Sequence, residues 1–165
     1  MAVSQSHLER LNHLARVVQR EAKHLALTDA KLFAAEFSAQ RAQSLDNDPD
    51  LAERVDAFVS RFGRLQDTLG DKLLPRLLAA LDEPVGAAID NLGRGERLGL
   101  IIDAERWREA RKLRNQMIHE YIEDPSILSS ALRSGHAFVP EMLATATAML
   151  NELDRRQFAP STHGN

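Results

Sequence analysis

Apolar and polar residues alternate along this chain with the period of an α-helix. In the clearest stretch, seven apolar side chains recur three or four positions apart: Leu51, Val55, Phe58, Val59, Phe62, Leu65 and Leu69. Runs of alternating β-branched residues, which are typical of strands, are nearly absent, and aromatic residues make up 5% of the chain. The pattern therefore predicts an all-α protein.

Capping residues divide the first half of the chain into helices. A first helix is expected over residues 5–27. Thr28 and Asp29 either continue that helix or cap a second one that reaches Ser44. After a turn, Pro49 suits the first position of the helix with the clearest apolar pattern.

The middle of the chain contains several helix breakers. Gly70 and Pro75 are expected to bend or interrupt the preceding helix, because proline has no backbone N–H and crowds the preceding turn. Residues 82–102 contain four glycines, which indicates one short helix followed by a loop. Asp103 resembles a helix N-cap, so a long helix is expected from there to about Glu123.

A last helix is expected from Pro125 to about residue 156, with a kink near Pro140. Residues 159–165 have the composition of a disordered tail. A chain of 165 residues is long enough to bury one core. We therefore expect a single helical domain over residues 1–158.

Composition excludes several kinds of site. The chain has no cysteine, which rules out disulfides and thiolate metal sites and is compatible with a reducing compartment. No N-terminal signal peptide or membrane span is evident, so the cytoplasm is the expected location. Glu21 and His24 match one half of a helical di-iron motif, but the required second copy is absent. We expect no metal and no cofactor.

Basic residues concentrate in one segment of an otherwise acidic chain. The formal net charge is −3, yet residues 94–114 contain seven basic and four acidic side chains. A local positive charge of this kind suits a phosphate-bearing ligand. In the alternative interpretation these residues form a solvated helix face with local ion pairs, for example between Glu105 and Arg108.

A compact set of chemically useful side chains follows this segment. Arg114, Asn115, His119 and Tyr121 lie within eight residues, and Tyr121 is the single tyrosine of the chain. Arginine binds phosphate through a rigid fork of donors, and histidine exchanges protons near neutral pH. On a helix, Arg114 falls inside the apolar stripe, while Asn115 and His119 share the adjoining shoulder.

The same shoulder also carries Arg108 and Arg111, so it suits a phosphate-bearing ligand. Together the residues suggest metal-free chemistry on a phosphodiester.

Each motif residue also has a purely structural interpretation. An unpaired charge in an apolar stripe is costly. Arg114 could therefore form an ion pair with a carboxylate of the helix after Pro49, from Asp67 or Glu53, in place of binding a phosphate. His119 near a helix C-terminus is favoured by the helix dipole without any function. Tyr121 suits a boundary position, with its ring buried and its hydroxyl in water. Three residues of the helix after Pro49 are candidates for lining the site, Asp67, Gln66 and Glu53, and of these we select Asp67 as the supporting residue.

The spacing Arg-Asn-x-x-x-His-x-Tyr, at the end of a long helix in a small helical chain, resembles the HEPN superfamily and specifically its HepT-like toxins. The motif match covers residues 114–121, and a weaker likeness of pattern covers residues 50–150. The resemblance implies an up-and-down bundle of four to six helices. It also implies a two-fold homodimer whose paired motifs form one RNA-cleaving cleft.

The resemblance further implies the roles of individual residues. Arg114 and His119 would be catalytic, with Asn115 and Asp67 in support. Arg108 and Arg111 are predicted to contact the RNA. Tyr121 would accept an adenylyl group from a partner antitoxin, a minimal nucleotidyltransferase. The expected function is that of a metal-independent endoribonuclease toxin. The alternative is a non-catalytic substrate-binding or adaptor subunit of such a nucleotidyltransferase.

Overall fold

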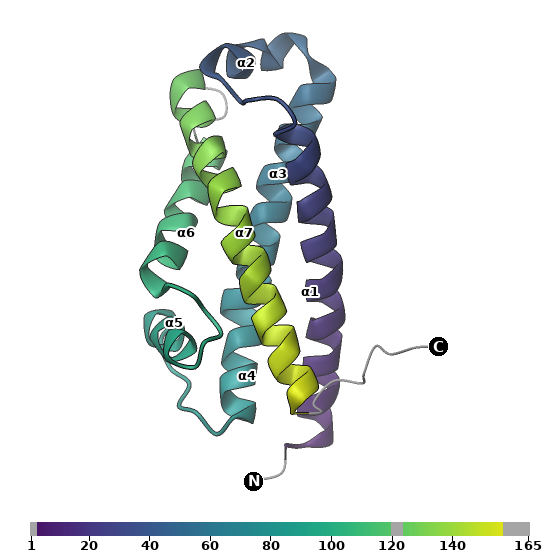
Figure 1. The fold of residues 1–165 in the computed structure, drawn as a ribbon, viewed down its shortest axis with the longest axis vertical. Helices are drawn as coiled ribbons and strands as arrows, with labels where there is room; N and C mark the ends of the chain where they lie inside the picture. The colour runs from purple at the N-terminus through teal and green to yellow at the C-terminus, as the bar shows by residue number, and fades with distance from the viewer. Residues whose placement is uncertain (1–2, 120–123, 157–165) are drawn as a thin grey trace, which may run out of the picture.

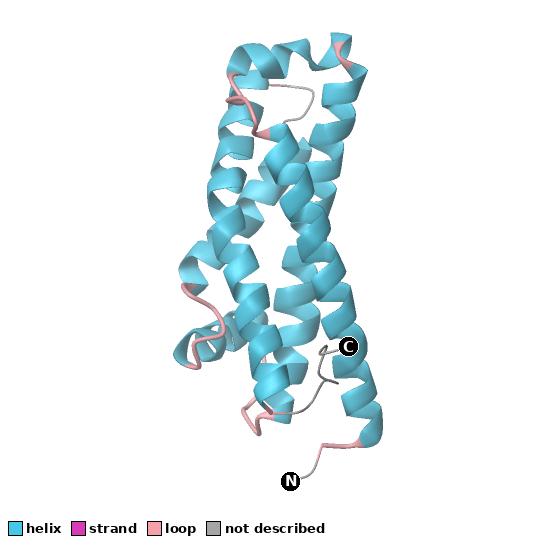
Figure 2. Ribbon diagram, turned by 45° about the vertical axis from the view of Figure 1, so that its right-hand side comes forward, coloured by secondary structure: helices cyan, strands magenta, loops and turns pink. Residues whose placement is uncertain are grey.

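The computed structural model describes residues 3–119 and 124–156, and these ranges form helices joined by short loops, without any strand (Figure 2). This confirms the predicted all-α class. Four long helices run along the length of the molecule, alternately up and down (Figure 1). They are α1 (Gln5–Leu32), α3 (Pro49–Asp67), α6 (Ala104–His119) and α7 (Pro125–Arg155).

The shorter helices close the two ends of this bundle. At one end, α2 (Ala39–Gln43) and a 3-10 turn (Ser44–Asn47) connect α1 to α3. At the other end, α5 (Ala88–Arg97) packs beside the start of α6 (Figure 1). The predicted short helix within residues 82–102 is thereby confirmed.

The end of α1 differs from the prediction of a helix that reaches Ser44. The first helix continues to Leu32, and an irregular segment then leads to α2. Arg41 stabilises this exit, because its Nη1 donates to the carbonyl oxygens of Leu32 at 2.8 Å and of Ala35 at 2.9 Å. The connecting segment also buries Phe37 completely. Helical periodicity reveals neither the hydrogen bonds of Arg41 nor the burial of Phe37.

The predicted interruption around Gly70 and Pro75 takes the form of a π-helical turn, Thr68–Leu73, through which α3 continues into α4 (Leu74–Ala80). In a π turn each N–H bonds one residue further back than in an α-helix, which accommodates one extra residue. Pro75 occupies the first turn of α4, where its missing N–H is tolerated. With this continuous helix counted once, the described residues form six helices.

Aspartate caps begin the last two long helices, and the cap at Asp103 confirms the prediction. Asp103 accepts hydrogen bonds from the N–H groups of Glu105 at 3.0 Å and Arg106 at 3.2 Å. Asp124 does the same for the first turn of α7, with bonds of 3.0 and 3.2 Å. Each carboxylate satisfies N–H groups that have no partner within the helix. The last helix continues through Pro140.

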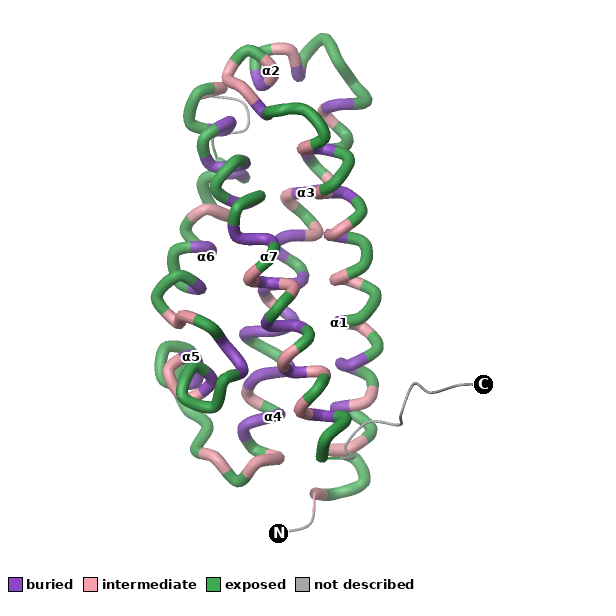
Figure 3. Tube along the Cα trace, viewed as in Figure 1, coloured by how far each residue is buried: buried purple, intermediate pink, exposed green. Residues whose placement is uncertain are grey.

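The core lies between the four long helices, whose buried positions face inward (Figure 3). A chain of aromatic contacts runs through it, with successive ring centroids 5.2 to 6.4 Å apart. The six rings, in order, are Phe37, Phe33, Phe58, Phe62, Phe138 and Trp107. Such contacts add to the stabilisation from apolar burial. They fix α6 and α7 against α3.

Two sequence predictions concern the ends and the surroundings of this bundle. The predicted disordered tail, residues 159–165, lies outside the described residues. Across the part of the chain that the structure describes, none of the helices combines the length and the apolar character needed to cross a membrane.

Candidate functional site

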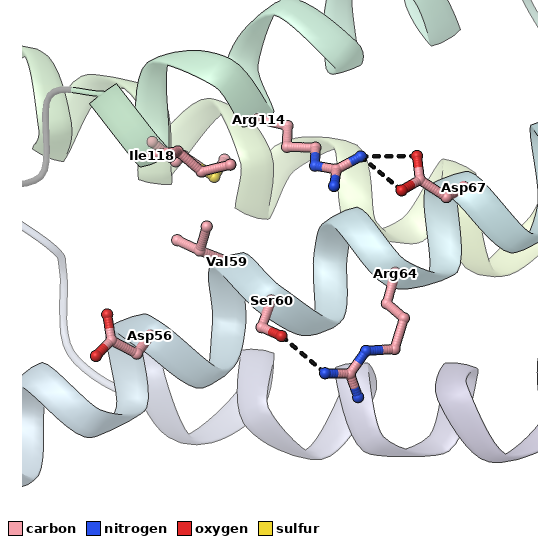
Figure 4. A pocket seen from close by; sticks show the side chains of 8 residues that line it. Asp56, Val59, Ser60, Arg64, Asp67, Arg114 and Ile118 are labelled. Carbon is pink, nitrogen blue, oxygen red and sulfur yellow. Dashed lines mark hydrogen bonds and ion pairs between the residues drawn. The ribbon is translucent and has the colours of Figure 1, made fainter.

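A groove between α3 and α6 contains the arginine of the predicted motif. This α3–α6 groove has a volume of about 550 Å³. Eight residues line it: Asp56, Val59, Ser60, Arg64, Asp67, Arg114, Met117 and Ile118 (Figure 4). Its floor is apolar and its borders carry two arginines and two aspartates. A ligand with both an apolar part and an anionic group matches this arrangement.

Arg114 extends along the groove and binds Asp67. Its Nη1 donates to both oxygens of the carboxylate, each at 2.7 Å (Figure 4). The side chains of Arg114 and Asp67 are 33% and 38% exposed, so the pair is open to solvent on one side. Both bonds use the same nitrogen. Within the described residues, the Nη2 and Nε groups of Arg114 have no acceptor, and they are free to donate to an anion in the groove.

The other two candidates for the residue that supports Arg114 do not contact it. Gln66 is completely buried, and its Nε2 donates to the carbonyl oxygen of Trp107 at 3.3 Å. Glu53 is exposed and lines a separate hollow between α1 and α3. Of the three, only Asp67 meets Arg114. The structural alternative of an ion pair between Arg114 and α3 is therefore realised, and it involves the residue selected as support.

Gly63 makes this position of Arg114 possible, and the sequence analysis did not identify it. A Cβ atom at Gly63 would lie 2.5 Å from Nε of Arg114, which is closer than real Cβ contacts. Because Gly63 has no side chain, the guanidinium lies directly on α3 and reaches Asp67, one turn further along. A glycine inside an otherwise strong helical pattern was the available signal.

A second contact of the same kind lies seven residues away on both helices. A Cβ atom at Gly70 would lie 3.0 Å from Nε1 of Trp107, which is fully buried. Next to it, Nη2 of Arg111 bonds to a carboxylate oxygen of Asp71. The antiparallel helices thus meet through two glycines and two arginine–aspartate pairs. This repeated contact sets the register of α6 on α3.

The predicted RNA-contacting arginines, Arg108 and Arg111, both have carboxylate partners. Arg108 bonds to Glu105 at 3.2 Å on the exposed face of α6. Arg111 is occupied by Asp71, as described above. The local pair between Glu105 and Arg108 is the one named in the alternative interpretation of the basic segment.

The excess positive charge of residues 94–114 is balanced by other parts of the fold. Three of its arginines bind acids from outside the segment: Arg106 with Glu141 at 2.8 Å, Arg111 with Asp71, and Arg114 with Asp67. These three acids equal the local excess of basic over acidic side chains. The segment is basic in the sequence and nearly neutral in the folded protein.

The remaining motif residues lie apart from the groove. Asn115 and His119 are exposed on α6, and neither is among the residues that line the groove. His119 is the last residue of α6, five positions after Arg114. Tyr121 falls outside the described residues. Ile118, which falls in the predicted apolar stripe, is 52% exposed at the border of the groove.

No group of three or more histidine, aspartate or glutamate side chains that could hold a metal ion occurs among the described residues. Glu21 and His24 line a hollow on the surface of α1 that also contains several basic side chains. The residues that the structure brings together at the α3–α6 groove are those suited to binding an anion.

Comparison with known proteins adds no assignment to this geometry. No protein-family model matches the chain, and no match was found among curated proteins or among solved structures.

Proposed function

We propose that this protein is a metal-independent endoribonuclease that acts as a homodimer, with Arg114 and His119 as its catalytic residues. The supporting observation is that the guanidinium of Arg114 is held in place and still has donor groups without a partner among the described residues. Asp67 and Gly63 hold its guanidinium in an open groove, with Nη2 and Nε free among the described residues. A fixed, partly satisfied guanidinium is suited to stabilising charge that develops on a phosphate.

The proposed reaction uses the 2′-hydroxyl of the RNA as the nucleophile. A bond forms between O2′ and phosphorus while the bond from phosphorus to O5′ breaks. One imidazole takes the proton of the 2′-hydroxyl, and a second acid gives a proton to the leaving O5′. The products are a 2′,3′-cyclic phosphate and a 5′-hydroxyl end. Arg114 stabilises the extra negative charge on the phosphate oxygens during the transfer.

This reaction needs a proton acceptor and a proton donor, whereas the motif supplies one histidine per chain. A two-fold dimer provides two copies of His119 and two of Arg114 in one cleft. The position of His119 suits such a cleft, because the side chain is exposed at the end of α6 and leaves the groove open. Asn115, one turn before His119, is proposed to orient the imidazole or a phosphate oxygen.

The proposed biological role is that of a cytoplasmic toxin controlled by a partner nucleotidyltransferase. Adenylylation of Tyr121 adds bulk and negative charge two residues from His119, and it would block RNA by occlusion and repulsion. Mass spectrometry of Tyr121 after incubation with a cognate nucleotidyltransferase tests this part of the proposal. If Tyr121 stays unmodified, the antitoxin would have to inhibit the toxin by binding to it and not by adenylylation.

Expression of the wild type beside Arg114→Ala and His119→Ala tests the catalytic assignment. Growth arrest and cleavage of total RNA in EDTA are expected for the wild type and are expected to be lost in both variants. His136→Ala is the matched control, because it removes an exposed imidazole of α7 that pairs with Asp29 of α1 and does not line the α3–α6 groove. It should cleave RNA like the wild type.

Light scattering and circular dichroism on the same proteins separate catalysis from folding. Variants that remain dimeric and helical but inactive support the proposal. Cleavage that persists in His119→Ala contradicts it. A folded wild type that neither arrests growth nor cleaves RNA favours the alternative of an adaptor subunit for a nucleotidyltransferase.

A further inference from the structure

A group of basic side chains without an ion-pair partner among the described residues lies where α1 meets α3 and α4, away from the segment that is basic in the sequence. Two hollows follow each other on that side of the bundle, of about 490 and 630 Å³, and we name them together the α1 basic groove. Six cationic side chains line it: Arg10, Arg16, Arg20, Arg64, Lys72 and Arg76. His7, His13 and His24 add three imidazoles.

The groove is far more basic than the protein as a whole. Two acidic residues, Glu21 and Asp71, accompany its six lysine and arginine side chains. The complete chain has 24 acidic against 21 lysine and arginine residues. All six cations are exposed, and none of them forms an ion pair with a described residue. A cluster of unpaired cations in a concave surface attracts a polyanion.

The two acidic residues differ in their surroundings. Asp71 is bonded to Arg111. Burial raises the pKa of Glu21 above its ordinary value, although Thr68 and the charges of Arg64 and Lys72 oppose the shift. Both hollows are lined by α1: His7 and Arg10 line one, and the next turns of the same helix line the other. The two hollows therefore follow each other along this helix.

Arg64 connects this surface to the α3–α6 groove, because it lines both. Figure 4 shows its side chain directed away from Arg114 and toward α1, with Nη2 bonded to Ser60 at 2.9 Å. A strand that leaves the phosphate position at Arg114 therefore crosses α3 at Arg64. On α1, Arg16 and Arg20 are one turn apart on the same face, so they continue the path in the same direction.

We propose that the α1 basic groove binds the phosphate backbone of single-stranded RNA that extends from Arg114. This inference rests on the proposed ribonuclease function and names the surface that holds the substrate. It also replaces Arg108 and Arg111 as the main RNA contacts, since their charges are satisfied by Glu105 and Asp71. Binding here is electrostatic and independent of base sequence.

Fluorescence anisotropy with a labelled single-stranded RNA tests the proposal, with His119→Ala as the parent protein so that the RNA is not cut. The double variant Arg16→Glu/Arg20→Glu is expected to weaken binding by at least about tenfold. The slope of log affinity against log salt should flatten by about 1.4, since two phosphate contacts on a single strand are lost. Arg16→Lys/Arg20→Lys keeps the charge and should bind nearly as well as the parent.

Arg97→Glu/Lys112→Glu is the matched control, because it makes the same change in net charge with two exposed residues of the sequence-basic segment. It should alter affinity by less than about threefold, since distant charges are screened by salt. Equal weakening by both double variants would overturn the proposal. So would competition by poly-glutamate as effective as that by RNA, which would assign the groove to an acidic polypeptide.

The outcome is separable from that of the ribonuclease proposal. Cleavage that persists in His119→Ala contradicts the catalytic assignment, whatever surface binds RNA. Unchanged binding in Arg16→Glu/Arg20→Glu, together with cleavage that depends on His119, contradicts the groove alone. Circular dichroism confirms that the charge-reversed protein remains helical.

Discussion

Arginines on the two sides of α3 differ in whether they form ion pairs. On the side of α6, Arg111 and Arg114 lie against the helix, and each is held by an aspartate of the same continuous helix. On the side of α1, Arg16 and Arg20 are exposed and have no ion-pair partner among the described residues. The first two are anchored by ion pairs that join the helices, although Arg114 keeps its Nη2 and Nε groups unbonded among the described residues, whereas the second two have no anchoring ion pair there.

The difference shows that a count of charges along the chain is a poor guide to which basic side chains remain without an ion pair in the folded protein. The segment around α6 has the larger local excess of basic residues, yet acids from α3 and α7 cancel that excess. The arginines of α1 are spread over a long helix, so they do not form a basic cluster in the sequence. They form one only where α1 packs against α3 and α4.

Trp107→Ala is expected to weaken the packing of α6 on α3 more than any other substitution proposed for this pair of helices. The indole is 1% exposed and packs over Gly70 and against Phe138. Its removal should lower the free energy of unfolding by about 3–5 kcal/mol, measured by urea denaturation. Ile102→Ala is the control, because Ile102 is 59% exposed and should change that free energy by less than about 0.5 kcal/mol. If Trp107→Ala lowered the free energy of unfolding no more than Ile102→Ala does, α6 would not be anchored through Trp107.

A double-mutant cycle on Arg114 and Asp67 measures the pair that distinguishes the two sides. With each side chain about one-third exposed, a coupling energy of about 1 kcal/mol is expected. The same cycle on the more exposed pair of Arg108 and Glu105 should give about 0.3 kcal/mol. Equal coupling in the two cycles would show that Asp67 does not hold Arg114 in place.

Gly63→Ala tests how Arg114 reaches Asp67. The new methyl group would occupy the position of the guanidinium and displace it, so the coupling between Arg114 and Asp67 should fall toward zero. Gly93→Ala is the matched control, since a Cβ there meets no atom within 4 Å. It should raise the free energy of unfolding by about 0.5–1 kcal/mol through helix propensity alone. Full coupling in Gly63→Ala would contradict the close approach.

Glu21→Gln addresses the α1 side and should have the smallest effect. Because burial raises the pKa of Glu21 in the folded state, that state binds the proton more tightly than the unfolded chain does. The contribution of Glu21 to stability therefore falls as the pH rises from its ordinary pKa through the raised one. Glu21→Gln should increase the free energy of unfolding at neutral pH and leave it unchanged in acid.

Urea denaturation over a series of pH values checks this expectation. Glu9→Gln, at an exposed position of the same helix, is the control and should show no such pH-dependent gain. A gain from Glu21→Gln that is the same in acid and at neutral pH would rule out titration as its cause.

Most of the fold could be predicted because helix starts are local. Pro49, Asp103 and Asp124 each act within one turn, and the structure begins helices at all three positions. Helical periodicity likewise identified the inward face of α3. The predictions were less complete at the end of α1, where Arg41 bonds carbonyl oxygens at the helix exit and Phe37 is buried. Around Gly70 and Pro75 the sequence predicted an interruption, but not that a π turn would keep the helix continuous.

By itself, the sequence determined the all-α class, the starts of the long helices, and the placement of Arg114, Asn115 and His119 on one of them. Only the tertiary structure decided which charges are satisfied. Arg114 and Asp67 are 47 positions apart, and Arg111 and Asp71 are 40 apart. Helix caps depend on neighbours within a single turn, whereas ion pairs and close glycine contacts depend on the register between two helices. That register arises from packing around Gly63, Gly70 and Trp107.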